Sequence, residues 1–138
     1  MLQDWLRDHP PPDSAFRQSA AGVAERVLAG EPFLPAVRDL LDEWKLLGTG
    51  EQRVRALAER PAPTGDTRYD AYLGALAEHL AALAAIDRPA WSYEPTRFLD
   101  RAWFVSEVPG FRAMAIAESP AAFRRRGIFI SRASLERT

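Results

Sequence analysis

The feature that most constrains this chain is a helical spacing of apolar residues, interrupted at intervals by proline. Between residues 34 and 47 apolar side chains recur every three or four positions, and acidic side chains occupy the opposite side. This pattern predicts an amphipathic helix with one buried face. Pro35 fits the first turn of that helix, because its missing N–H would have no partner there in any case. The apolar positions are Leu34, Val37, Leu40, Leu41, Trp44 and Leu47.

Two shorter helices are expected on either side of this one. The earlier helix follows a proline run at residues 10–12, with Asp13 or Ser14 as its N-cap and Gly30 as its left-handed C-terminal cap. The later helix is expected to begin after Thr49. Each is amphipathic, so each needs a neighbour against which to bury its apolar face.

The longest helix is expected to begin at Thr67, because Thr67 followed by Asp70 resembles a capping box with Asp in the usual Glu position. Its many alanines allow another helix to approach closely. Its apolar stripe consists of Tyr69, Tyr72, Leu73, Leu76, Leu80 and Leu83.

The last third of the chain is broken into short pieces by proline and is rich in aromatic residues and arginine. Residues 109–118 are expected to be helical, with Phe111, Met114 and Ala115 facing inward. Ser119 followed by proline predicts an N-cap for a short helix that Gly127 ends, and Ser131 or Ser134 begins a last helical turn. Residues 128–130 are too short a run to predict a strand.

These patterns together predict an all-α fold. We expect a single-domain helical bundle of four or five main helices with an aromatic, proline-broken C-terminal subdomain. The bundle would span residues 13–86, the subdomain residues 87–138 and a short N-terminal segment residues 1–12. A chain of 138 residues with 47% hydrophobic side chains is long enough and apolar enough to bury one core.

Composition narrows the chemistry that the chain can perform. There is no cysteine, which excludes disulfides, thiolate metal sites and a cysteine nucleophile. No apolar run approaches the length of a membrane helix, and the start lacks the pattern of a signal peptide, so we expect a cytoplasmic protein without membrane contact.

No catalytic or metal-binding pattern stands out. The two histidines, His9 and His79, lack the spacing of a metal site, and His79 is expected at the edge of the long helix, bonded to a backbone carbonyl. Asp39, Asp42 and Glu43 fit the exposed face of an amphipathic helix. We therefore predict a protein that is not an enzyme and has no cofactor, while an enzyme with an unfamiliar site near His79 and neighbouring tyrosines stays open as a competitor.

Charge is unevenly distributed. The formal net charge is −1, yet residues 97–138 carry eight basic and four acidic side chains, for a local charge of +4. Arg124, Arg125 and Arg126 form the densest cluster, and on a short helix they point in different directions, so they cannot all face one ligand. The arginines either face a partner or rest against the chain's own acidic helices. The second arrangement needs no partner and is favoured.

The C-terminal third carries a resemblance. Its strings Arg97-Phe98-Leu99-Asp100-Arg101-Ala102-Trp103-Phe104 and Ser119-Pro120-Ala121-Ala122-Phe123-Arg124-Arg125-Arg126-Gly127-Ile128-Phe129-Ile130 are the basis of that resemblance. They resemble the C-terminal region of small actinobacterial-type antitoxin or regulator proteins, often fused to an Xre-type helix-turn-helix and encoded beside nucleotidyltransferase-like toxins. Residues 14–60 depart from that pattern, because they contain no compact pair of helices with a basic recognition helix.

The resemblance implies an antitoxin-like protein that binds a cognate toxin and occludes its active site. The partner-binding residues would be Trp103, Phe104, Phe123, Arg124, Arg125 and Arg126. Arginine together with aromatic residues is also the composition of interface hot spots. Two alternatives stay open: a nucleic-acid-binding transcriptional regulator, and a helical interaction or structural domain without a toxin partner, which includes a homodimer.

Overall fold

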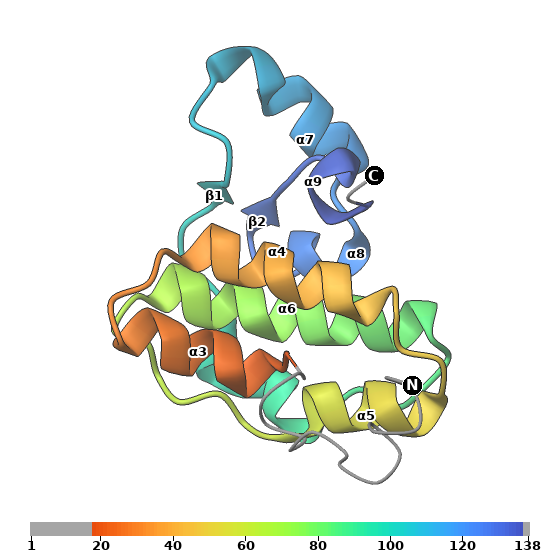
Figure 1. Cartoon of the computed structure of the whole chain (residues 1–138). Helices are drawn as coiled ribbons and strands as arrows, with labels where there is room; N and C mark the ends of the chain where they lie inside the picture. Colours follow the sequence, from red (N-terminus) through yellow and green to blue (C-terminus); the bar gives the residue numbers. More distant parts are fainter. Residues whose placement is uncertain (1–17, 137–138) are drawn as a thin grey trace, which may run out of the picture.

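The computed structural model describes residues 18–136, and the predicted N-terminal segment and the N-caps at Asp13 or Ser14 lie outside this range. Within the described range 61% of residues are helical and 3% are in strands, which confirms the all-α prediction. Figure 1 shows α4 and α6 running side by side, with α5 below them and a C-terminal cap of short elements above.

Four helices form the bundle: α3 (Ala20–Leu28), α4 (Phe33–Trp44), α5 (Gly50–Ala58) and α6 (Thr67–Leu83). The start of each helix is set by residues at its N-terminal end, through a capping side chain or a proline in the first turn. Ser19 caps α3 by accepting a hydrogen bond from the Gly22 N–H, and Thr49 forms a full capping box with Gln52 at α5. Pro35 lies in the first turn of α4, as predicted.

Helix α3 begins at Ala20, with Ser19 in an extended conformation as its N-cap. The predicted start of α6 at Thr67 is confirmed, but the predicted capping box of Thr67 with Asp70 is wrong. The N-cap is Asp66, whose carboxylate accepts from the Arg68 N–H. Asp70 instead accepts hydrogen bonds from the backbone N–H and hydroxyl of Thr64, and so fixes the loop that leads into the helix.

Helix α6 is the centre of the molecule. It is buried on several sides, because α5, α8 and the 3-10 turns η1 (Ala90–Tyr93) and η2 (Pro95–Arg97) all contact it. The predicted stripe is therefore only part of its buried surface, and Leu83, at 70% exposure, does not belong to it. Gly74 allows the closest approach: a Cβ there would lie 2.9 Å from the Arg97 Cβ.

The C-terminal cap consists of β1 (Trp103–Phe104), η3 (Pro109–Phe111), α7 (Arg112–Glu118), α8 (Ala121–Arg124), β2 (Ile128–Phe129) and α9 (Arg132–Glu136). The two short strands pair in parallel, with Trp103 opposite Ile128 and Phe104 opposite Phe129. Gly127 precedes β2 with a φ of +80°, which a glycine adopts without strain, so its predicted role as a helix stop is confirmed.

Ser119 does not cap α8, contrary to prediction. The N-cap is Pro120, and the Ser119 hydroxyl instead accepts from the Ile130 N–H at 2.9 Å and donates to a backbone carbonyl. This serine therefore ties the end of α7 to the segment after β2. The buried cluster of the bundle also includes Ile128, Ile130 and Leu135, so bundle and cap share one core.

Candidate functional site

The structure separates the six residues that were predicted to form an arginine–aromatic surface. Trp103 and Phe104 are half-buried in β1, and Arg124 and Arg125 are exposed at the end of α8. Phe123 is completely buried, with its ring 5.1 Å from that of Tyr72. Arg126 is 1% exposed. Phe123 and Arg126 therefore cannot contribute to a surface, and this part of the prediction is wrong.

The physical reason is the direction in which successive residues point along α8. Adjacent residues on a helix lie about 100° apart, so a four-residue helix that packs one side on α6 turns some of its side chains inward. Phe123 fills the core, and Arg126 follows it into the interior. Arg124 remains outside and donates to the carbonyls of Ile116 and Ser119.

Arg126 forms a buried ion pair with Glu78 of α6. Its Nη1 lies 2.6 Å from Glu78 Oε1. The same guanidinium donates to the carbonyls of Ala122 and Ser92, and it lies over the ring of Phe98 at 4.7 Å. These contacts fasten the C-terminal cap to the central helix, which confirms the favoured expectation that the tail rests against the chain's own acidic residues.

The second carboxylate oxygen of Glu78 completes the cluster. Glu78 Oε2 accepts from the Tyr93 hydroxyl at 2.6 Å and lies 3.1 Å from Arg125 Nη1. Burial alone would raise the pKa of Glu78. The hydrogen bonds from Tyr93 and Arg126, with the charges of both arginines, outweigh burial and lower the pKa below its ordinary value.

Arg97 is a second buried arginine, and the residues around it in the sequence did not predict its burial. It is 2% exposed, donates to the carbonyls of Asp70 and Pro61, and lies over the Trp91 ring at 5.0 Å. Burial lowers its pKa from the ordinary arginine value, although a guanidinium stays charged in a protein. The only signal in the sequence was Gly74, a glycine within a strong helix, which Arg97 packs against.

An apolar groove lies between the C-terminal cap and α4, and it is the strongest candidate for a binding surface. Its volume is about 430 Å³. The rings of Phe104 and Phe129 stack 4.9 Å apart along it, and Phe111 and Met114 remain 47% and 45% exposed at its edge. We call this surface the apolar groove, and its apolar lining consists of Leu34, Phe104, Val105, Phe111, Met114, Ala115, Phe129, Ile130 and Ala133.

The sequence predicted that Phe111 and Met114 face inward, and both predictions are wrong. Only Ala115 of α7 is buried. Helix α7 stands above the bundle (Figure 1), and among the described residues its chief neighbours are η3 and β2, so Met114 and Ile116 stay exposed. Helical periodicity gives the apolar side of a helix, but it does not say whether another element lies against that side.

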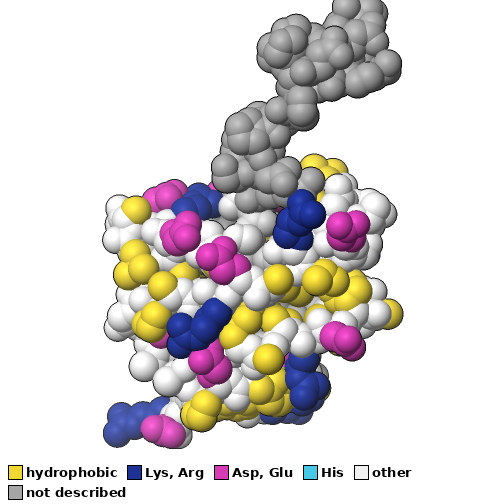
Figure 2. Space-filling view, turned by 90° about the horizontal axis from the view of Figure 1, so that it is seen from below, with side chains coloured by type: hydrophobic (Ala, Val, Ile, Leu, Met, Phe, Trp, Pro, Cys, Tyr) yellow, Lys and Arg dark blue, Asp and Glu magenta, His cyan; other side chains and the backbone are white. Residues whose placement is uncertain are grey.

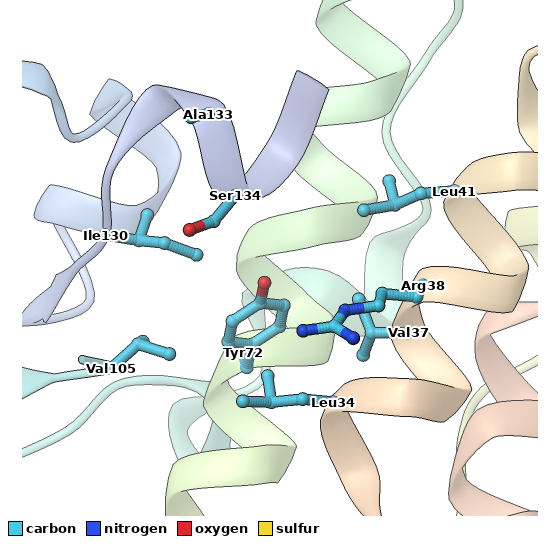
Figure 3. Close-up of a pocket in the computed structure, with 9 residues that line it drawn as sticks. All are labelled: Leu34, Val37, Arg38, Leu41, Tyr72, Val105, Ile130, Ala133 and Ser134. Carbon is cyan, nitrogen blue, oxygen red and sulfur yellow. The ribbon is translucent and has the colours of Figure 1, made fainter. Parts of the chain in front are cut away.

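A second pocket continues from the apolar groove and is more polar. It has a volume of about 310 Å³ and shares Leu34, Val105, Ile130, Ala133 and Ser134 with the groove. In Figure 3, Arg38 reaches into it from α4, and the hydroxyl of Tyr72 points toward Ser134 on α9. We call this pocket the polar end of the groove. Burial raises the pKa of Tyr72 well above its ordinary value, so the phenol stays neutral.

His79, the centre of the enzyme competitor, lies in a different pocket. It is half-buried and shares a space of about 530 Å³ with Lys45 and Glu118, and no tyrosine lines that space. No hydrogen bond joins it to a backbone carbonyl in the described part of the chain, so that expectation is wrong. Its ring instead meets Phe123 edge-on at 6.0 Å. Burial lowers its pKa.

Residues 18–136 give little support for a metal site, a membrane-spanning helix or a nucleic-acid interface. In that range no three histidine, aspartate or glutamate side chains gather in a way that could hold a metal ion. No helix there combines the length and hydropathy needed to cross a bilayer. Figure 2, which shows the molecule from below, displays basic and acidic side chains interspersed, with no basic tract.

Comparison with known proteins gives no relative. No protein-family model, no curated protein and no solved structure matches this chain.

Proposed function

We propose that this protein is a non-enzymatic, antitoxin-like protein that binds a partner protein through the apolar groove. The observation that supports this is the gathering of partly exposed, large apolar side chains along one concavity. Single exposed apolar residues are common on any surface, but a contiguous apolar patch on a soluble domain marks an interaction site. Leu34, Phe111 and Met114 supply such a patch from three elements, α4, η3 and α7.

The apolar groove is a better candidate for the partner-binding site than the arginine cluster at Arg124, Arg125 and Arg126. Hot spots are large side chains that can be desolvated by a partner, and Phe123 and Arg126 are already desolvated by their own chain. Phe104 lines the groove and keeps its proposed role, whereas Trp103 lines a separate pocket with Thr67 and Asp100. Arg124 and Arg125 lie outside its lining and would contribute at most at the rim, where charges affect the rate of association more than affinity.

The chemistry of the groove indicates the chemistry of the partner. Its centre is apolar, and Arg112 lies over the Phe104 ring at 5.2 Å without an ion pair to any residue of 18–136. Residues 97–138 carry a charge of +4 in total. A partner segment that is apolar in its centre and acidic at its edges complements this surface.

The resemblance of the C-terminal third supplies the identity of the partner. We propose a nucleotidyltransferase-like toxin encoded next to this protein, bound in the cytoplasm so that its active site is covered. No cofactor has a role in this mechanism. Homodimerisation through the same groove and nucleic-acid binding are the competing outcomes that the experiment below distinguishes.

The test is to express the neighbouring gene product with and without this chain, and to measure growth together with copurification. We expect toxicity of the neighbour alone, rescue by this chain and a stable complex. Met114→Glu places a charge in the groove and is expected to abolish rescue. Leu46→Glu is the matched control, because Leu46 is 83% exposed and lies between α4 and α5, away from the groove.

Three other outcomes would each refute this proposal. A non-toxic neighbour that forms no complex would refute the antitoxin-like role. A dimer in solution that Met114→Glu dissociates would assign the groove to self-association. Binding of DNA that weakens steeply with salt and is insensitive to Met114→Glu would favour the regulator alternative.

A further inference from the structure

We propose that the polar end of the groove binds the carboxylate of a medium-chain, fatty-acid-like ligand, with the alkyl tail of the ligand lying in the apolar groove. This site is formed by Tyr72, Arg38 and Ser134. It is a small-molecule site, so it goes beyond the partner protein proposed above and is tested on this chain alone.

Tyr72 provides the first observation. It is 98% buried, and its ring is fixed by edge-on contacts with Phe33, Trp103 and Phe123 at 5.2, 6.2 and 5.1 Å. Its hydroxyl has no hydrogen-bond partner among the described residues and points into the pocket (Figure 3). A phenol that opens into a pocket keeps its O–H available as a donor to a bound molecule. A rigid, unpartnered donor aimed into a pocket indicates a ligand that accepts a hydrogen bond.

Arg38 provides the charge. It extends from α4 to the same pocket, and it forms no ion pair with any residue of 18–136. The neighbouring Asp39 is occupied by Arg26, with 2.9 Å between Asp39 Oδ2 and Arg26 Nη2. Arg38 is therefore available to an anion. An arginine fork and a neutral phenol are both donors, and together they match an acceptor that has two oxygens and one negative charge.

These donors fit a carboxylate better than a phosphate. A phosphate group carries up to two charges and three acceptor oxygens, and it is usually held by several cations or by backbone N–H groups. The polar end offers one arginine and one phenol. Ser134 adds a hydroxyl whose oxygen lies 2.9 Å from that of Ser131, so this pair of serines can orient toward either a donor or an acceptor.

The remaining walls indicate an alkyl tail. Leu34, Val105 and Ile130 line both pockets, so the polar end and the apolar groove are neighbours. The two pockets, about 310 and 430 Å³, are within the range of small-molecule sites. A head group that needs donors, followed by a tail that needs apolar walls, describes a monocarboxylic acid with an extended alkyl chain.

The experiment is a calorimetric titration of the full chain with sodium decanoate, with decanol and acetate as comparison probes. We expect saturable one-to-one binding of decanoate, binding of decanol that is at least tenfold weaker, and no binding of acetate. Decanol retains the tail without the charge, and acetate retains the charge without the tail.

Variants of the lining residues test whether decanoate binds at the polar end of the groove. Arg38→Gln and Tyr72→Phe are each expected to weaken decanoate binding roughly tenfold, since each removes one hydrogen bond to a charged group. Arg101→Gln is the matched control, because Arg101 lies in a separate pocket with Thr67 and Asp100. Circular dichroism of each variant confirms that the fold is retained.

Three results would overturn the proposal. These are no saturable binding of decanoate, equal affinity for decanol and decanoate, or equal affinity in Arg38→Gln and the Arg101 control. Failure of this test leaves the partner-protein proposal standing, because that proposal depends on copurification and on Met114. Failure of the toxin experiment likewise leaves decanoate binding unaffected.

Discussion

Removal of the charge of Glu78 should loosen the C-terminal cap from the bundle. In Glu78→Gln the side chain keeps its shape and one acceptor oxygen, but it loses charge-assisted hydrogen bonds with Arg126 and Tyr93, both 2.6 Å long. A hydrogen bond to a charged group contributes about 1 kcal/mol more than a neutral one. The two bonds together predict a loss of about 2 kcal/mol in the free energy of unfolding.

Replacement by an apolar residue should cost more. Glu78→Leu leaves Arg126 charged and buried without a counterion, and breaking a buried pair in this way costs about 3–5 kcal/mol. The side chain of Glu78 is 11% exposed and that of Arg126 is fully enclosed, so water can relieve little of this cost. The combination of Glu78→Leu with Arg126→Met removes both charges and is expected to recover part of the loss.

Thermal denaturation followed by tryptophan fluorescence measures both changes, with Glu107→Gln as the control at an exposed glutamate of the cap. The predicted shift in Tm for Glu78→Gln is roughly 6–10 °C. Since the folded pKa of Glu78 is lowered, its contribution is present above the unfolded pKa, about 4.3, and is lost as pH falls through the folded value. An unchanged Tm, or a difference from wild type that does not shrink as pH falls below about 4.3, would refute the assignment of this pair.

Two further changes test other contacts of α6. Gly74→Ala should destabilise the fold by about 1–3 kcal/mol although alanine is the better helix former, because its Cβ would meet the Arg97 Cβ at 2.9 Å and the Ser92 carbonyl oxygen at 3.1 Å. Gly110→Ala, where a Cβ meets nothing within 4 Å, is the control, and equal stability of the two variants would show that the close approach is wrong. His79→Gln should remove a pH dependence: the folded pKa of His79 is lowered, so wild-type stability is full above the unfolded pKa of about 6.5 and declines as pH falls from there toward the folded value. Unfolding experiments between pH 5 and 8 measure this, and parallel profiles for the two proteins would contradict it.

The bundle could be predicted because its signals are local. The spacing of apolar residues from Val37 to Trp44 fixes the buried side of α4, and Thr49 with Gln52 fixes the start of α5. Each of these depends on residues within a few turns of one another. The predicted place of Leu34 on that buried side is wrong, because Leu34 is 39% exposed. Pro35 is also informative without tertiary contacts, since proline is tolerated only in the first turn of a helix.

The cap could be predicted only in part, because its outcome depends on distant partners. The sequence could not show that Ser119 bonds to Ile130 instead of capping a helix, since the two are brought together by the turn at Gly127. It likewise could not show that Arg126 turns inward and Arg125 stays at the surface. Both arginines directly follow the short helix α8, and only the position of Glu78 on α6 distinguishes them.

The candidate site was missed for the same reason. Phe111 and Met114 have the pattern of inward-facing residues, and whether they are covered depends on whether another element packs on α7. Tyr72 was placed correctly on the buried stripe, but the free direction of its hydroxyl depends on α9, which is distant from it in the sequence. A periodic pattern identifies apolar surface, and only the assembled fold shows which of that surface stays open.

The central claim is that partner binding occurs at the apolar groove and not at the arginine cluster. The most direct measurement is the dissociation constant of the complex with the neighbouring gene product, compared between Met114→Glu and Arg125→Gln. Arg125 is exposed and belongs to the cluster, whereas Met114 lines the groove. We predict that Met114→Glu weakens the complex at least tenfold while Arg125→Gln changes it less than about twofold. A complex that tolerates Met114→Glu and is lost in Arg125→Gln would contradict the account.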